Sequence, residues 1–196
     1  MGFKEENEIT VRVQCSEDEL KKILNNDKFI LNNEYYAKDI FMIPKDIDIL
    51  KVTTREILSK AILLREFQGI SSEKHKMKIT FKHKEINEKG EILQQDAVNC
   101  EVLNIQDAEN IFDCIGYKEI MTIKEKHFSY YKGDFKIIVK ILSENNILIE
   151  AETNEEYRTI EKLKKEINNT NIPFDHSNYF VKKAEEELEK IKNGEC

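Results

Sequence analysis

Residues 74–84 read KHKMKITFKHK, and this stretch decides the expected fold. One parity of the stretch carries a row of lysines: Lys74, Lys76, Lys78, Lys82 and Lys84. The other parity is mostly apolar, so the stretch predicts a β-strand with one ammonium-rich face and one apolar face. Such a cationic face lies either in solvent, as on an ordinary half-exposed strand, or around an enclosed anion. The neighbouring strands decide between these two alternatives.

The composition is that of a folded globular protein. The 196 residues include 40% hydrophobic and 35% charged residues, and we expect one domain over residues 1–196, with a helical C-terminal segment from about residue 155. The formal net charge of −7 disfavours general binding of nucleic acid. No apolar run reaches the length of a membrane span, and the first residues lack a signal-peptide core. We therefore expect no membrane partner and a cytoplasmic location.

Cysteine and histidine spacing does not indicate a zinc site. The four cysteines, Cys15, Cys100, Cys114 and Cys196, are widely separated and form no CxxC pair, which is typical of a reduced intracellular chain. The four histidines show no metal-binding spacing either. We expect them to be structural or exposed.

Alternation and capping signals predict a chain of strands interrupted by helices. The expected strands cover residues 8–13, 35–43, 61–67, 74–84, 92–103, 120–131, 135–142 and 147–153. The expected helices cover residues 16–26, 105–117, 155–169 and 178–193. Ser16 and Glu19 form a capping-box pattern at the first helix, and Gly116 is expected to end the second. Residues 45–59 are poorly periodic and predict a loop or an irregular segment.

Charges of both signs recur on one face of strand after strand: Glu8, Arg12, Arg65, the lysine row, Glu101, Lys124, Lys126, Glu150 and Glu152. The intervening amphipathic helices need an apolar sheet surface on which to pack. The sequence therefore predicts an α+β fold: an antiparallel β-barrel, closed or nearly closed, with charge inside, helices packed outside and a helical C-terminus. A cationic interior is costly unless it is neutralised, and carboxylates or a bound polyanion can do this.

The order of these motifs resembles that of the CYTH superfamily, the triphosphate tunnel metalloenzymes. EITVR (8–12) resembles its first ExExK strand, KDIFMIP (38–44) its second strand and AILLREF (61–67) its A-L-R-x-R strand. The later motifs follow in the same order: KITFK, NCEV, IKEK, LIEAE and the terminal HSNYF. The resemblance spans nearly the whole chain. The superfamily includes thiamine triphosphatases, inorganic tripolyphosphatases and adenylate cyclases of the fourth class.

Several positions depart from the family pattern. Thr10 and Asn99 replace carboxylates, Arg12 replaces a lysine, Leu63 replaces an arginine, and Lys140 stands where an aspartate is usual. Most basic positions of the family pattern are thus occupied by basic residues, while several of its acidic positions are not occupied by carboxylates. This pattern favours phosphate binding more strongly than metal-dependent turnover.

The resemblance implies that a basic tunnel binds a small-molecule triphosphate or nucleotide. The implied phosphate-binding residues are Arg12, Arg65, Lys82, Lys124 and Lys126. The implied ligands of Mg²⁺ or Mn²⁺ are Glu8, Glu101, Glu150 and Glu152. We expect metal-dependent hydrolysis of the kind catalysed by tripolyphosphatases or thiamine triphosphatases. A cyclase of the fourth class and a non-catalytic sensor of polyphosphate or nucleotide are the alternatives, no catalytic residue is assigned, and a homodimer is left open.

Overall fold

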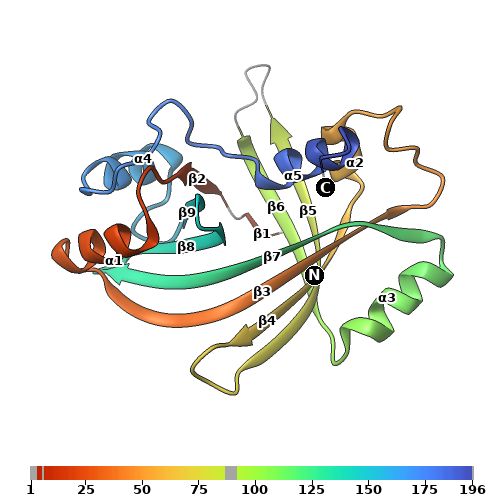
Figure 1. The fold of residues 1–196 in the computed structure, drawn as a ribbon, viewed down its shortest axis with the longest axis horizontal. Coiled ribbons are helices and arrows are strands. Elements are labelled where there is room, and N and C mark those ends of the chain that lie inside the picture. Colours follow the sequence, from red (N-terminus) through yellow and green to blue (C-terminus); the bar gives the residue numbers. More distant parts are fainter. Residues whose placement is uncertain (1–3, 6, 87–91, 196) are drawn as a thin grey trace.

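A single antiparallel sheet organises the molecule (Figure 1). The structure, a computed structural model, describes the backbone of residues 4, 5, 7–86 and 92–195 and the side chains of residues 7–83 and 96–195. Within these residues the strand order is β1-β6-β5-β4-β3-β7-β8-β9-β2. The strands are β1 (Lys4–Glu5), β2 (Glu8–Arg12), β3 (Ile30–Pro44), β4 (Ile62–Gly69), β5 (His75–Ile86), β6 (Ile92–Glu101), β7 (Tyr117–Lys132), β8 (Phe135–Ser143) and β9 (Asn146–Glu152). The segment NEKG at 87–90 predicts a turn, but it lies outside the described residues.

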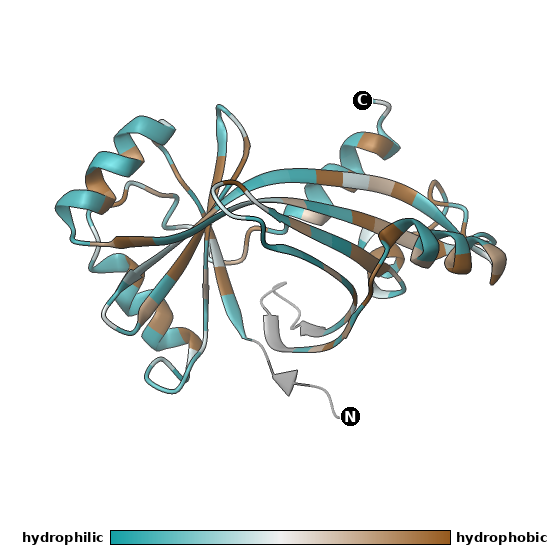
Figure 2. Cartoon of the chain, turned by 90° about the horizontal axis from the view of Figure 1, so that it is seen from below, coloured by the Kyte–Doolittle hydropathy of each residue, from teal (hydrophilic) through white to brown (hydrophobic). Residues whose placement is uncertain are grey.

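The start of the chain links the two edges of this sheet. β1 pairs with β6, where Lys4 lies opposite Ala97, and β2 pairs with β9, where Glu8 lies opposite Glu152. Because β1 and β2 follow each other closely in the sequence, both edges must approach one another, and the strands bend around a common interior (Figure 2). No pair of described strands closes the sheet by hydrogen bonds. The predicted α+β fold with a nearly closed antiparallel barrel is confirmed.

Helices α1 (Glu17–Asn26) and α4 (Ile160–Asn168) cover the outer face at one end of the sheet. Their buried residues Leu20 and Leu163 pack with outward-facing strand residues such as Val11 and Ile149 in one apolar cluster. The Ser16–Glu19 capping box predicted for α1 is present, with the side chain and backbone contacts in both directions. Burial of this outer face explains why the odd residues of β2 and β9 are apolar.

Helix α3 (Ile105–Cys114) covers another part of the outer face. Ile105 and Ala108 pack on the strand residues Ile40, Met42 and Leu64. Just beyond the helix, the residue at position 116 has a φ of 94°, a left-handed conformation that suits the glycine found there and ends the helix as expected. No helix in the described part of the chain is both long and apolar enough to cross a membrane.

Helices α2 (Thr54–Ser59) and α5 (Lys183–Lys192) pack against inner-face residues instead. Leu188 of α5 and Ile57 of α2 lie in one buried cluster with Phe41, Leu63 and Ile123, which share the strand parity that faces the interior. The two helices therefore cover one end of the enclosed space (Figure 1). Helix α2 lies in the segment 45–59 for which the sequence predicted no regular element. The sequence pattern is weak there because the helix has only six residues.

Candidate functional site

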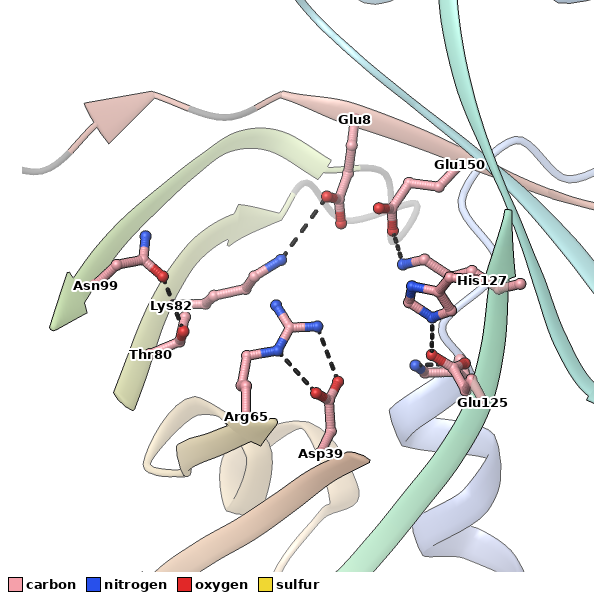
Figure 3. Close-up of polar contacts among 11 residues, drawn as sticks. Glu8, Asp39, Arg65, Thr80, Lys82, Asn99, Glu125, His127 and Glu150 are labelled. Atoms are coloured by element: carbon pink, nitrogen blue, oxygen red, sulfur yellow. Dashed lines mark hydrogen bonds and ion pairs between the residues drawn. The ribbon is translucent and has the colours of Figure 1, made fainter. Parts of the chain in front are cut away.

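Strand register gathers charged side chains on the inner face of the sheet. Antiparallel pairing places the following residues directly opposite one another: Asp39 and Arg65, His127 and Lys140, Thr10 and Glu150, and Glu8 and Glu152. Directly opposite residues share a face and have neighbouring Cβ atoms. The interior face is thus formed by odd residues on β3, β4 and β7 and by even residues on β2, β5, β8 and β9. Figure 3 shows several of these side chains, among them Glu8, Asp39, Arg65, His127 and Glu150, converging from different strands.

Arg65 and Asp39 form a buried, bidentate ion pair (Figure 3). The Nε and Nη2 atoms of Arg65 donate to the two carboxylate oxygens of Asp39 at 2.8 and 2.9 Å. Burial alone would raise the pKa of Asp39, but the charge and hydrogen bonds of the guanidinium outweigh it and lower that pKa. The carboxylate correspondingly raises the pKa of Arg65. Both groups therefore stay charged in the interior.

Three glutamates lie close together where β2 pairs with β9. Glu8, Glu150 and Glu152 each offer a carboxylate oxygen, and these oxygens lie within 4.8 Å of one another. Burial, followed by the negative charge of Glu150, raises the pKa of Glu152. Three carboxylates this close together would be stabilised by a further cation. We call these three residues the carboxylate cluster.

Lysines already contact the carboxylate cluster. The ammonium of Lys140 donates to Glu150, and both side chains are almost fully buried. Lys82 Nζ lies 3.7 Å from Glu8, and Lys136 Nζ lies 3.9 Å from Glu152. Burial would raise the pKa of Glu150, but the charges of Lys140 and Lys82 lower it to about 2. Glu150 is thus ionised at neutral pH.

A second buried network joins β7 to the C-terminal helix. Glu125 Oε1 accepts from Lys183 Nζ of α5 at 2.7 Å, and Glu125 Oε2 lies 2.7 Å from Nε2 of His127. Burial opposes ionisation of Glu125, but the hydrogen bond from His127 and the charge of Lys183 lower its pKa. Burial, together with the charge of Lys140, lowers the pKa of His127, so its imidazole is neutral at pH 7. This network anchors α5 to the inner face.

A cavity of about 590 Å³ lies among these groups. Its cationic lining residues are Arg65 of β4, Lys82 of β5, Lys140 of β8 and Lys183 of α5, together with Arg55 and Lys182. Glu8, Asp39 and Glu150 supply negative charge to the same wall. Asp39, Glu56 and Glu185 also line this wall, and they are carboxylates that the sequence did not assign to the site. The six cations therefore face five carboxylates, so the wall is closer to neutral than the sequence suggested.

No protein-family model and no curated protein matches the sequence. Solved structures do match its fold. The PH1819 protein from Pyrococcus horikoshii OT3 has a TM-score of 0.69 at 19% identity, covering 94% of this chain and 99% of its own. A candidate adenylate cyclase from Vibrio parahaemolyticus has a TM-score of 0.62 at 15% identity, covering 96% and 99%. HpAC1 from Hippeastrum, a candidate adenylyl cyclase described as having a dominant triphosphatase activity, has a TM-score of 0.58 at 13% identity, covering 97% and 96%.

The chain has a CYTH-like fold. At these sequence identities the likeness shows the fold alone, and it confirms the predicted architecture. Within this CYTH-like fold, the roles of individual residues depend on where the structure places them.

Five of the predicted site residues lie together in the interior: Arg65, Lys82, Glu8, Glu150 and Glu152. Arg12 also faces inward but lies at the rim, where its guanidinium binds Glu186 of α5 at 2.5 Å and also donates to Asn146. Glu101 lies at the end of β6, exposed, in an ion pair with Lys76. The structure therefore does not bring Arg12 or Glu101 to the carboxylate cluster.

The expected inward orientation of Lys124 and Lys126 is wrong. Lys124 is exposed, and the ammonium of Lys126 lies 4.8 Å from the centre of the Phe128 ring. Their neighbours Glu125 and His127 are buried on the inner face instead. β7 alternates charge on both parities in this segment, so the sequence pattern did not indicate which parity faces inward.

The other interior residues were missed for different reasons. Asp39 lies in a quoted motif but in a strand that is apolar on both sides, so nothing marked its carboxylate as functional. Lys183 belongs to a helix in which seven of the ten residues are charged, so the pattern singled out no one of them. At a position where the resemblance implies a carboxylate, Asn99 accepts a hydrogen bond from the Thr80 hydroxyl at 2.8 Å (Figure 3). These two residues form a neutral contact and leave no charge there.

The carboxylate cluster fits a hard divalent cation. Its donors are all oxygen, they come from two paired strands, and they lie close enough to share one ion. Burial and the neighbouring charge of Glu150 raise the pKa of Glu152, and a bound cation would favour its ionised form. The contact between Lys140 and Glu150 competes with such an ion, because Glu150 already accepts from an ammonium group.

Proposed function

We propose that the interior cavity binds a triphosphate-containing compound and that the protein hydrolyses it with the help of a divalent cation. One observation carries this proposal: the same cavity has on its wall four cations, from three strands and α5, and lies beside three clustered carboxylates. A triphosphate is a flexible chain of negative charge that requires this kind of cationic lining. The similarity in fold to a protein with a described triphosphatase activity supports the proposal.

Arg65 and Lys82 are the residues best placed to hold the phosphate chain. Arg65 uses Nε and Nη2 for Asp39, so Nη1, for which no bond appears within the described residues, is left to donate to a ligand. Asp39 fixes the guanidinium in one orientation, which reduces the entropy lost on binding. Lys82 lies 3.7 Å from Glu8, a loose contact that an incoming phosphate oxygen can replace.

Lys140 and Lys183 would stabilise negative charge that develops on the phosphoryl group during transfer. Both are buried ammonium groups held in place by carboxylates, so little reorganisation is required when charge builds up. Glu8, Glu150 and Glu152 would hold Mg²⁺ or Mn²⁺. The chemistry that such a cation supplies is neutralisation of phosphate charge and alignment of the phosphate chain.

A second, more open cavity adjoins the first and suggests where an organic group would lie. It has a volume of about 910 Å³ and shares Arg55, Lys182 and Glu185 with the interior cavity. The aromatic residues Tyr179 and Phe180 contribute to its wall. A substrate with an organic group, such as a nucleoside triphosphate, could place its phosphates inside and its organic part in this outer cavity.

The test is incubation of the protein with tripolyphosphate, thiamine triphosphate or ATP, each with Mg²⁺, with Mn²⁺ and with a chelator. We expect metal-dependent release of phosphate. Glu8→Gln should reduce turnover and weaken Mg²⁺ binding by about tenfold or more, because one charged ligand is lost. The matched control is Glu101→Gln, which removes a carboxylate far from the cluster and should change neither. Equal behaviour of the two variants would contradict the proposed metal site.

A non-catalytic sensor is the second candidate, and a specific observation favours it. Lys140 contacts Glu150 of the carboxylate cluster and so supplies there the positive charge that a metal ion would otherwise supply. Such a site would bind an anion through its own ammonium and guanidinium groups, with little need of a metal. Tight binding of tripolyphosphate with no product under any metal condition would support the sensor, and formation of cyclic AMP from ATP would support the cyclase.

A further inference from the structure

One buried polar atom has no hydrogen-bond partner among the described residues, and it lies in this interior. It is Nδ1 of His127, whose side chain is almost fully buried. Leaving a buried polar atom without a partner costs about 1–3 kcal/mol, so native proteins rarely do so without a reason. The atom therefore indicates a hydrogen bond that forms in another state of the site.

The contacts of His127 define what this atom can do. Glu125 is ionised, since its pKa is lowered, and an ionised carboxylate can only accept. Nε2 of His127 therefore carries the proton and donates to Glu125 Oε2 at 2.7 Å. In the neutral ring Nδ1 is then an acceptor with a lone pair, so its missing partner must be a donor.

Lys140 is the candidate donor that the register of the neighbouring strand β8 provides. It lies directly opposite His127 in the register of β7 and β8, so both side chains are on the same face of the sheet, and both are buried. Lys140 lines the interior cavity. Side chains at directly opposite positions are within reach of one another, especially when one is long. Lys140 now donates to Glu150, a member of the carboxylate cluster.

These contacts create a conflict that His127 can resolve. A divalent cation bound by the carboxylate cluster needs the Glu150 oxygen and would repel the ammonium beside it. The displaced ammonium cannot remain buried without a partner, because an unpaired buried charge is strongly destabilising. A neutral lone-pair acceptor directly across the strand pair is the environment that such an ammonium requires.

We propose that His127 is a positioning residue whose Nδ1 is the second acceptor for the Lys140 ammonium, used when Glu150 turns to a divalent cation. Glu125 fixes the tautomer that makes this possible. Lys140 then alternates between Glu150 in the metal-free site and His127 in the loaded site, and it stays beside the cavity in both. The metal-dependent part of this inference rests on the proposed function, while the existence of the second acceptor does not.

The first experiment follows the side-chain nitrogens of His127 by ¹⁵N NMR at pH 8. In the metal-free protein we expect the Nε2–H tautomer, with Nδ1 at the position of a weakly bonded acceptor. Glu150→Leu removes the first acceptor without any metal, and Nδ1 should then move upfield as it accepts from Lys140. Addition of Mg²⁺ to the unaltered protein should produce a shift in the same direction.

The second experiment uses a matched pair of variants and measures Mg²⁺ affinity by calorimetry. His127→Gln keeps an amide N–H donor near the position of Nε2 that can contact Glu125, but it has no acceptor near the position of Nδ1. It should weaken Mg²⁺ binding by about tenfold to a hundredfold. His127→Asn keeps an acceptor near Nδ1 but loses the contact with Glu125, and it should bind Mg²⁺ about as well as the unaltered protein. The reverse order of affinities would overturn the proposal.

The outcomes separate the two hypotheses. An Nδ1 signal that does not move in Glu150→Leu overturns the second-acceptor role, as does Mg²⁺ binding that leaves Nδ1 unmoved. If Nδ1 moves in Glu150→Leu but no Mg²⁺ binds to the unaltered protein, the second acceptor is supported and the metal-dependent hydrolysis proposed above fails. If Glu150→Leu does not fold, the Mg²⁺ titration of the unaltered protein and the His127 pair decide.

Discussion

The interior contains two sets of carboxylates that differ in how their charge is compensated. Asp39 and Glu125 are each matched closely: Asp39 receives two hydrogen bonds from Arg65, and Glu125 receives one from Lys183 and one from His127. Both have lowered pKa values. The negative charge of each of these two carboxylates is therefore compensated by groups of the protein itself.

The carboxylate cluster of Glu8, Glu150 and Glu152 is different. Its three oxygens lie within 4.8 Å of one another, and two of its lysine contacts are loose, at 3.7 and 3.9 Å. The pKa of Glu152 is raised where that of Glu150 is lowered, so charge within the cluster is unevenly compensated. This difference indicates that the matched pairs stabilise the interior, while the carboxylate cluster can bind a further cation.

Breaking the most closely matched pair should have the largest effect. Arg65→Ala leaves Asp39 as a buried carboxylate without a cation and should lower the free energy of unfolding by about 3–5 kcal/mol. The double variant Arg65→Leu with Asp39→Leu should recover much of this loss, because no charge is then left unpaired. Urea denaturation followed by circular dichroism measures both. A single variant as stable as the double one would show that the pair is not closely compensated.

Acid should reduce the stability that both sets of carboxylates contribute to the folded protein. We expect this effect to be the second largest. Groups with a lowered folded-state pKa, here Asp39, Glu125 and Glu150, contribute stability above their unfolded-state values, and this stability is lost as the pH falls through their folded-state values. For Glu150, whose pKa falls from 4.5 to about 2, about 1–2 kcal/mol of this stability is lost at pH 3. Glu152 acts in the opposite direction, since its pKa is raised. Urea denaturation at pH 7, 5 and 3 checks this, and stability independent of pH would contradict it.

Removing a lysine that contacts the carboxylate cluster should affect ligand binding more than folding. Lys82→Ala should weaken tripolyphosphate binding by about 1–3 kcal/mol, as expected for a lost charge-assisted hydrogen bond. Lys124→Ala is the matched control, because Lys124 is exposed on the other side of the sheet and should leave the affinity unchanged. Isothermal titration calorimetry of the two variants tests this, and equal losses would remove Lys82 from the site.

The smallest effect is expected at the exposed pair of Lys76 and Glu101. Their side chains are 58% and 72% exposed, so solvent already screens their charges. Lys76→Ala should change the free energy of unfolding by less than about 1 kcal/mol. The same urea denaturation measures it, and a loss as large as that of Arg65→Ala would refute the distinction between interior and surface pairs.

Prediction from the sequence succeeded where one face of a strand was clearly apolar. In β2 and β9, the residues between the glutamates are apolar and pack under α1 and α4, so their parity indicated that Glu8 and Glu150 face inward. In β7 the apolar residues change sides along the strand: Ile123 packs inside with α5, while Phe128 packs outside. The alternation therefore gave two equally good readings around Lys124, and the wrong parity was chosen.

The sequence by itself determined the order of the longer strands and helices, without β1 and α2, and it also determined the α+β class and the recurrence of charge on one side of the sheet. These follow from local periodicity and capping, which neighbouring residues specify. Only the tertiary structure decided which carboxylate meets which cation, that Glu125 and His127 face the interior, and that Lys183 reaches them from the C-terminal helix. Those contacts depend on register and on packing between residues far apart in the chain, and local pattern carries no information about either.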